Sequence, residues 1–313
     1  MNMKIRYTLL FLLLCLTAQA QQVPHYSQYI FNSMAINPAY TGSKKVLNLN
    51  AFHRSQWTGM EGAPTTQSLN ADGLTASDRL GLGLSLTRDK LGEQSVLSAY
   101  GNVAAKLAVS EKGVLSLGLA AGIVQHKLDG LELGITDDPS IPSGNQVWIR
   151  PDLKLGLYYH TDRFYAGLSV SDLLQFDDMQ QLEPEKQYYF TTGYVFDMGS
   201  NFKFKPSILV KEDFNAPANV DLNAFVLLKE MLWLGTSYRT SLGIFEQIPE
   251  DPARMKRTAL ALIAEIQVNK AFRLGYSYDK MLNDLRGLHT HEVSVGYYFF
   301  RKQDTRMLTP QYF

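Results

Sequence analysis

The histidine pair near the end of the chain has the spacing most typical of a metal site. His289, His291 and Glu292 stand in the stretch His289-Thr290-His291-Glu292. Alternate residues of a β-strand share a face, so the two histidines could hold a metal between them while Glu292 points to the opposite face. A polar junction between a loop and a strand explains the same residues without a ligand, and we predict no metal site here.

The other patterns that could do chemistry are weaker. The acidic pairs Asp137-Asp138 and Asp177-Asp178 have the residue types of a calcium loop, but solvated turns have them too. Gly81-Leu82-Gly83 matches part of a phosphate-binding loop, yet it stands in a strand pattern with no helix after it. The sequence contains no Gly-x-Ser-x-Gly nucleophile motif. We therefore predict that the protein is not an enzyme and binds no cofactor.

The N-terminal residues have the layout of a secretory signal peptide. Two basic residues precede an apolar run from Tyr7 to Leu16, and Ala18-Gln19-Ala20 supplies small residues for a cleavage site. A membrane anchor is the competing interpretation, but the run is too short to span a bilayer comfortably. We therefore predict that residues 1–20 are a signal peptide and that the mature chain begins near Gln21.

The composition of the mature chain excludes several classes of function. The only cysteine, Cys15, lies in the predicted signal after three leucines, whereas a lipoprotein signal needs a small residue there. The mature chain is thus predicted to have no thiol, disulfide or lipid anchor. Two of the 30 basic residues belong to the signal, which leaves 28 Lys and Arg against 30 Asp and Glu. We predict no nucleic-acid partner, because that function needs a basic surplus.

Apolar residues alternate with polar or small residues along most of the chain. In Leu80–Thr87 every second residue is leucine and the others are glycine, serine or threonine. This alternation places the leucines on one face of a strand. After the signal, no apolar run approaches the roughly 20 residues of a membrane helix. The pattern predicts an all-β fold, a transmembrane antiparallel β-barrel of about 14 strands over residues 46–300 in the outer membrane. The predicted strands lie near 46–54, 66–73, 80–87, 96–107, 115–125, 147–159, 164–171, 187–197, 202–211, 219–228, 232–239, 258–267, 271–279 and 291–300.

The connections between these stretches are alternately short and long. Tight polar turns are predicted at 109–113, 160–163, 197–201 and 268–270, and these are typical of the periplasmic side of a barrel. Longer connections, which include 126–146, 172–186 and 240–257, are expected to face outside the cell. A soluble β-sandwich also alternates, but the number of strands and the alternating loop lengths favour the barrel.

The two faces of the predicted strands differ in charge. Leu153, Leu155 and Leu157 oppose Asp152 and Lys154, and the later strands repeat this separation. Charged residues thus gather on the face away from lipid. On the lipid face, a Lys or Arg at the membrane midplane would cost about 2–4 kcal/mol. Aromatic residues that suit an interfacial girdle are Tyr188, Tyr189, Phe190, Tyr194, Phe196, Tyr297 and Phe299.

Several short motifs distributed along the chain are specific in combination. Asn37-Pro38-Ala39-Tyr40-Thr41-Gly42 precedes the first predicted strand, and Arg54-Ser55-Gln56-Trp57 and Gly62-Ala63-Pro64 follow at its end. Leu232-Trp233-Leu234-Gly235-Thr236-Ser237-Tyr238-Arg239, Gly275-Tyr276-Ser277-Tyr278-Asp279 and His291-Glu292 come later. With these motifs the chain closely resembles the PorP/SprF family, outer-membrane proteins of the type IX secretion system in the Bacteroidetes. The resemblance covers nearly the whole mature chain.

The resemblance implies a non-enzymatic role in protein secretion and gliding motility. Family members help to export large surface adhesins, or hold them at the cell surface, through the adhesins' C-terminal domains. The expected partners are such a secreted surface protein, other type IX components or lipoproteins, and outer-membrane lipid. A channel or transporter for small solutes is the alternative. The candidate partner-binding or structural residues are Asn37, Pro38, Tyr40, Arg54, Trp57, Gly62, Pro64, Trp233, Arg239 and Asp279.

The pre-barrel segment, residues 21–45, could fill or cover the interior of the barrel. A barrel of about 14 strands is too wide for its own side chains to fill, so its interior needs water or a plug. Residues 21–43 would suit either a plug or a periplasmic lid, because they include Tyr26, Tyr29, Ile30, Phe31, Met34 and Ile36.

Two further questions stay open at this stage. Trp57 and the Gly62-Ala63-Pro64 turn could contact a partner outside the cell, whereas Arg54 and Trp57 could instead cap the first hairpin. In that structural alternative, Arg54 pairs inside the barrel with a group such as Glu265 or Asp279. The tail, residues 301–313, ends in an aromatic residue, so either Phe300 or Phe313 could act as the assembly signal.

Overall fold

The computed structural model describes residues 26–129, 144–175, 185–243, 258–282 and 287–299. Three 3-10 turns come first, η2 (Ser27–Phe31), η3 (Ser33–Ala35) and η4 (Pro38–Tyr40). The strands follow: β1 (Leu47–Thr58), β2 (Thr65–Leu74), β3 (Leu80–Leu91), β4 (Gln94–Ala108), β5 (Val114–Asp129), β6 (Asn145–His160), β7 (Phe164–Ser171), β8 (Gln187–Tyr194), β9 (Phe196–Asp197), β10 (Phe202–Glu212), β11 (Ala218–Leu228), β12 (Leu232–Leu242), β13 (Ala259–Gln267), β14 (Phe272–Met281) and β15 (His289–Phe299).

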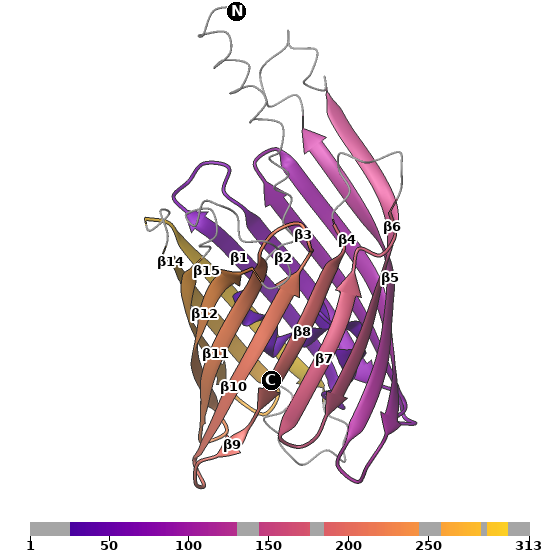
Figure 1. Ribbon diagram of the computed structural model, residues 1–313, viewed down its shortest axis with the longest axis vertical. Coiled ribbons are helices and arrows are strands. Elements are labelled where there is room, and N and C mark those ends of the chain that lie inside the picture. Colours follow the sequence, from indigo (N-terminus) through magenta and orange to yellow (C-terminus); the bar gives the residue numbers. More distant parts are fainter. Residues whose placement is uncertain (1–25, 130–143, 176–184, 244–257, 283–286, 300–313) are drawn as a thin grey trace, which may run out of the picture.

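The sheet closes on itself as a barrel (Figure 1). Each strand pairs antiparallel with its neighbours in the chain, and β1 also pairs with β15, with Arg54 opposite Glu292. Because β8 and β9 both pair with β10 and are separated only at Val195, they form one interrupted strand. The barrel therefore has 14 antiparallel strands, as the alternation predicts, and every predicted strand is confirmed. Several strands are longer than predicted; β3 continues to Leu91 and β5 to Asp129.

The connections at one end of the barrel are tight turns, and the other end carries the longer connections together with the short β3–β4 turn (Figure 1). We call these the tight-turn end and the long-loop end. The turns at 109–113, 160–163, 197–201 and 268–270 all lie at the tight-turn end, as predicted. The acidic pairs Asp137-Asp138 and Asp177-Asp178 and the tail, residues 301–313, lie outside the described residues.

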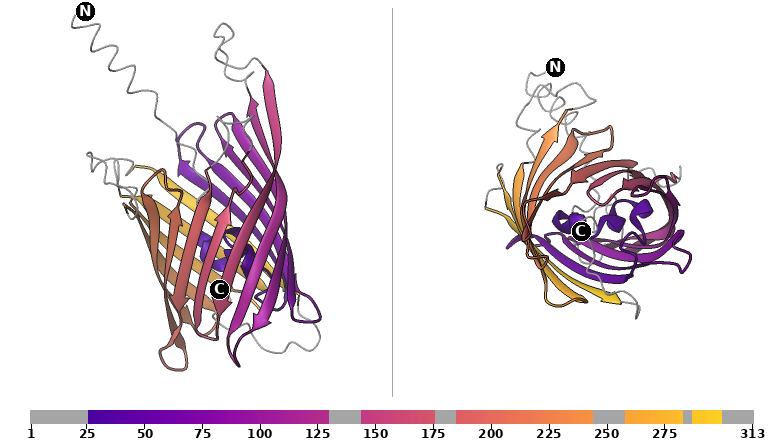
Figure 2. Two further views of the ribbon diagram at one scale, coloured as in Figure 1. Left: turned by 45° about the vertical axis from the view of Figure 1, so that its right-hand side comes forward. Right: turned by 90° about the horizontal axis from the view of Figure 1, so that it is seen from below.

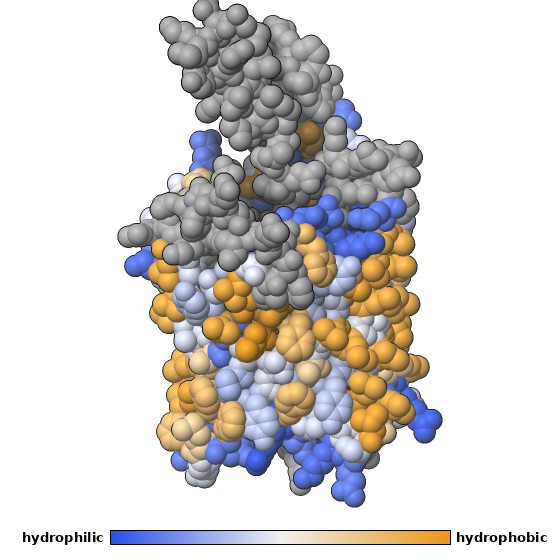
Figure 3. Space-filling view, in the orientation of Figure 1, coloured by the Kyte–Doolittle hydropathy of each residue, from blue (hydrophilic) through white to orange (hydrophobic). Residues whose placement is uncertain are grey.

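The outer surface of the barrel is apolar along its middle. Leu80, Leu82, Leu84 and Leu86 point outward and are all at least 42% exposed, whereas the alternate residues of β3 point inward. Figure 3 shows hydrophobic side chains along both flanks of the visible face, with paler ones between them, above a hydrophilic lower end. This belt fits a barrel that crosses a bilayer. No helix in the described ranges is long and apolar enough to cross a membrane.

The girdle prediction is wrong for Tyr189. Tyr188 and Phe190 are 40% and 41% exposed on the outer surface, as expected, but Tyr189 between them is buried inside the barrel. Three consecutive aromatic residues in a strand cannot share a face, so the middle one must point the other way. Tyr189 belongs to an interior hydrophobic cluster with Tyr29 and Leu209.

Candidate functional site

The interior of the barrel is occupied by the residues that precede β1. Figure 2 shows this part of the chain inside the ring of strands, where the molecule is seen from below. We call residues 26–46 the inner segment. Its three 3-10 turns are short and carry most of the segment's buried side chains. Inner-segment residues contact strands on all sides of the barrel, as the following contacts show.

The Asn-Pro-Ala-Tyr motif anchors the inner segment to one wall. The Asn37 amide N–H groups donate to the Leu157 carbonyl at 3.0 Å and the Leu168 carbonyl at 3.2 Å. The Asn37 Oδ1 atom accepts from the Ala39 backbone N–H at 2.9 Å, so Asn37 also caps η4. Pro38 fits the first position of that turn because it needs no N–H donor there. Tyr40 packs edge-on against Tyr158, with ring centroids 5.3 Å apart.

Glycines in the wall let the inner segment approach the strands. A Cβ atom on Gly118 of β5 would overlap the Ala39 backbone, and one on Gly156 of β6 would overlap the Asn37 side chain. A Cβ on Gly81 of β3 would likewise overlap the Thr41 carbonyl. The inner segment and the wall are therefore in backbone contact, with no space for a side chain between them.

A buried charged cluster holds the start of the inner segment against the opposite wall. Glu292 accepts hydrogen bonds from the backbone N–H groups of Ser27 at 2.8 Å and Gln28 at 2.9 Å. The Arg54 guanidinium forms ion pairs with Glu292 and, at 3.2 Å, with Asp279. The side chains of Arg54, Asp279 and Glu292 are 4%, 3% and 0% exposed. Arg54 is thus paired inside the barrel with Asp279, one of the two partners that its structural interpretation named.

A second ion pair extends this charged cluster around the wall. Arg239 Nε lies 2.9 Å from Asp221 Oδ1, and its Nη1 lies 4.0 Å from Asp279. Asn223, two residues after Asp221, donates to the Tyr29 hydroxyl at 2.7 Å. The Ser27 hydroxyl also bonds to Arg54, Arg239 and Asp279, so strands β11, β12, β14, β15 and β1 all hold the first turn of the inner segment.

The far end of the inner segment is fixed near the tight-turn end. The Gly42 backbone N–H donates to Asp72 at 2.8 Å, and Asn48 donates to the same carboxylate at 2.8 Å. The Lys44 ammonium donates to the Phe31 carbonyl at 3.1 Å, within the inner segment itself. Arg273 donates to Asn48 at 2.7 Å. Both ends of the segment are therefore tied to the barrel.

Apolar packing completes the contact between segment and wall. Tyr29, Ile30, Phe31 and Ile36 form one buried cluster with Tyr189, Leu209, Phe225, Leu227, Trp233, Ala261 and Ile263. Trp233 is 2% exposed and packs edge-on against Phe225. Trp233 is therefore part of the interior packing and does not reach an outer surface.

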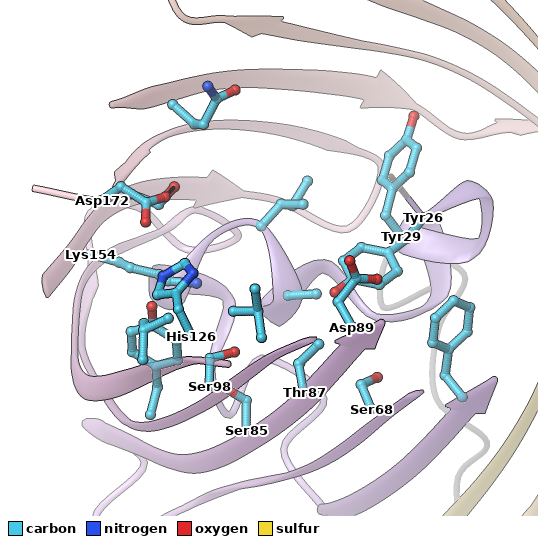
Figure 4. Close-up of a pocket in the computed structure, with 18 of the residues that line it drawn as sticks. Tyr26, Tyr29, Ser68, Ser85, Thr87, Asp89, Ser98, His126, Lys154 and Asp172 are labelled. Atoms are coloured by element: carbon cyan, nitrogen blue, oxygen red, sulfur yellow. Dashed lines mark hydrogen bonds between the residues drawn. The ribbon is translucent and has the colours of Figure 1, made fainter. Parts of the chain in front are cut away.

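A cavity of about 300 Å³ lies beside the inner segment toward the long-loop end (Figure 4). Tyr26 and Tyr29 of the inner segment form one side of it, and a wall of hydroxyl groups from β2, β3 and β4 forms another. His126, Lys154 and Asp172 line the remaining side. Nearby, Arg150 pairs with Asp172 at 2.9 Å.

The predicted site residues fall into two groups. Those inside the barrel are Asn37, Pro38, Tyr40, Arg54, Trp233, Arg239 and Asp279. Those in or beside the β1–β2 connection are Trp57, Gly62 and Pro64. Gly62 has a φ of 71° and accepts a hydrogen bond from the Gly92 backbone N–H, which joins this connection to the β3–β4 turn. The structure thus brings the first group together around the inner segment and leaves the second at the long-loop end.

The histidine pair lies outside both groups. His289 and His291 point outward from β15, and their Nδ1 atoms bond to the hydroxyls of Tyr278 at 2.6 Å and Tyr276 at 2.8 Å. Glu292 points to the opposite face, as predicted. Among the described residues, no group of three or more His, Cys, Asp or Glu side chains could hold a metal ion.

Some interior residues were not singled out as sites from the sequence. Asp221 and the wall glycines Gly118 and Gly156 belong to this group. Glu292 belongs to the His291-Glu292 motif, but the sequence did not predict its pairing with Arg54. Alternation places such residues on the inner face, as it did for Glu292, but it does not show which residue each one contacts.

Comparisons with known proteins agree with this architecture. A family model described as type IX secretion system membrane protein PorP/SprF matches residues 18–297. The fold is similar to a solved structure of CymD, a monoaromatic hydrocarbon channel, with a TM-score of 0.55 at 13% identity over 86% of this chain and 93% of that one. It is also similar to the outer membrane protein Omp33 of Acinetobacter baumannii, with a TM-score of 0.50 at 10% identity over 82% of this chain and 98% of that one. The search of curated proteins found no match.

Proposed function

Because this chain belongs to the PorP/SprF family of type IX secretion system membrane proteins, we propose that it helps to secrete or anchor a large surface protein through that protein's C-terminal domain. The protein is an outer-membrane β-barrel. We propose that this role is non-enzymatic and that the surface protein is an adhesin used in gliding motility.

The filled interior is the observation that carries the proposal. The inner segment is bonded to β6 and β7 on one side and to β11, β14 and β15 on the other. A folded protein cannot pass through a barrel of this width while a bonded segment crosses it. In this proposal, cargo therefore contacts the outer surfaces of the protein, mainly at the long-loop end.

The β1–β2 connection offers a specific contact surface at that end. A surface groove of about 450 Å³ lies between this connection and the β3–β4 turn, lined by residues that include Gln56, Met60 and Gly62. Met60 is 45% exposed, which gives the groove an apolar contact point. This surface supports an accessory role, in which the barrel holds a partner at the cell surface.

Affinity purification from native cells tests the proposal. The tagged full-length barrel is extracted in mild detergent, and co-purifying proteins are identified by quantitative mass spectrometry. We expect one large surface protein with a type IX C-terminal domain to be enriched, and a Met60→Asp variant with the same abundance to lose it. Enrichment of periplasmic motor or ring components alone would favour a core secretion role, and recovery of neither would contradict the proposal.

The cavity beside the inner segment supports a second candidate function, a channel for small solutes. Its volume of about 300 Å³ is at the lower end of the range for small-molecule sites. Conductance of the purified protein in planar bilayers separates the two functions, because a channel conducts without any change to the inner segment. We expect the unmodified protein to show no stable open state.

A further inference from the structure

Basic side chains gather on the outer surface of the barrel at the long-loop end, on one side only. Arg88 and Lys90 of β3 and Lys280 of β14 are exposed and point outward, away from the barrel interior. Lys127 of β5 occupies an outward position by alternation at the edge of the cavity lining, and its ammonium forms an ion pair with Asp129 at 3.1 Å. In the same half of the barrel, the described outward positions of β7, β8 and β10 to β13 hold no Lys or Arg. The nearest lysine on that side, Lys186, precedes β8.

Strand register places these cations in one band. Lys90 lies opposite Thr65 of β2 and Ser95 of β4, and Ser95 lies opposite Lys127. On the other side of β2, Thr65 lies opposite Ser55, and Ser55 lies opposite His291. Neighbouring strands are about 4.8 Å apart, so Lys90 and Lys127 lie about 10 Å apart, and Lys280, four strands from Lys90, lies about 19 Å from it. The row is thus one polar stretch along the outer surface.

Polar hydrogen-bonding groups accompany the cations. His289 pairs across the strands with Lys280, and His53 bonds to the Ser55 hydroxyl at 3.1 Å. In both His289 and His291 the Nδ1 atom bonds to a tyrosine hydroxyl, and the Nε2 atom takes no part in that bond. Aromatic and amphipathic side chains of this kind are typical of the membrane–water interface.

The groove between the β1–β2 connection and the β3–β4 turn lies directly beside this band. Ser55, Thr65 and Lys90 belong to both, and the groove holds about 450 Å³. Its lining also includes one carboxylate residue, Glu93. The outward row thus reaches the rim of this groove at Ser55, Thr65 and Lys90.

We propose that this band, Arg88, Lys90, Lys127 and Lys280 with their neighbouring hydroxyls and histidines, binds the phosphate groups of an outer-leaflet glycolipid. Exposed cations at a membrane surface attract anionic headgroups with about 1 kcal/mol each. The band faces the lipid side and lies at the end expected to face outside, so a lipid phosphate is the anion that meets it.

Lipid binding by the purified full-length protein tests this inference. Phosphorylated lipid A and its dephosphorylated form are titrated into the protein in neutral detergent, and bound lipid is counted by native mass spectrometry. We expect R88Q/K90Q/K280Q to bind phosphorylated lipid A about 100-fold more weakly, because each charge contributes about fivefold. The charge-preserving variant R88K/K90R/K280R should retain binding.

The matched control removes three exposed lysines from the tight-turn end, as K112Q/K229Q/K270Q. We expect it to bind lipid A like the unmodified protein. Equal binding by R88Q/K90Q/K280Q, or equal binding of dephosphorylated lipid A, would overturn the inference. Displacement of lipid A by inorganic phosphate at equal concentration would assign the band to free phosphate and would also overturn it.

Discussion

Replacing Arg54 by methionine tests whether the buried charged cluster holds the interior together. Loss of one partner from a buried ion pair typically costs about 3–5 kcal/mol, because it leaves an uncompensated charge. Here Glu292 keeps two backbone N–H donors and Asp279 keeps the Ser27 hydroxyl and a more distant Arg239. We therefore expect the low end of that range, about 3 kcal/mol off the free energy of unfolding.

Urea unfolding of the refolded barrel in lipid vesicles, followed by tryptophan fluorescence, gives this number. Arg79→Met is the matched control, because Arg79 is exposed in the β2–β3 turn and its loss should change stability by less than about 0.5 kcal/mol. Arg54→Met combined with Glu292→Gln should recover part of the loss, since the second change removes the unpaired charge. A loss below about 1 kcal/mol for Arg54→Met alone would refute the reasoning.

Three other changes test the inner segment. Asn37→Ala removes two hydrogen bonds to the wall and one cap, so it should cost about 2–3 kcal/mol and speed proteolysis of the inner segment; unchanged digestion would contradict this. Gly118→Ala should cost about 1–3 kcal/mol by displacing the inner segment, whereas Gly101→Ala, whose Cβ has space, should be tolerated in the same unfolding assay. Deletion of residues 21–43 should create bilayer conductance that the full chain lacks, and a silent deletion variant with intact strands would argue against a plug.

The strands were predictable because a strand in a barrel wall has two chemically different sides. Lipid on one side and a polar interior on the other impose a period of two, and Leu80–Thr87 displays it without interruption. The same rule predicts that Tyr188, Tyr189 and Phe190 cannot all face lipid, so the wrong placement of Tyr189 came from composition being given more weight than alternation.

Contacts across the interior were not predictable from the pattern. Alternation places Arg54 on the inner face, but it cannot tell which inward carboxylate lies opposite, because that depends on how β1 and β15 pair after the chain has gone around the barrel. Asp279 was among the partners named and Glu292 was not. The inner segment likewise suited a plug or a lid equally well, since its short 3-10 turns have no period that reveals a buried face.

The seam between β1 and β15 has a consequence for the order in which the molecule is assembled. These are the first and last strands, so their pairing needs the whole wall to have been synthesised. Arg54 and Glu292 meet across that seam, and Glu292 also holds the backbone of Ser27 and Gln28. A wall that joined while the inner segment was still outside would enclose Glu292 without these backbone donors and Asp279 without the Ser27 hydroxyl. Pairing of β1 with β15 is therefore more favourable after the inner segment has entered the barrel than before.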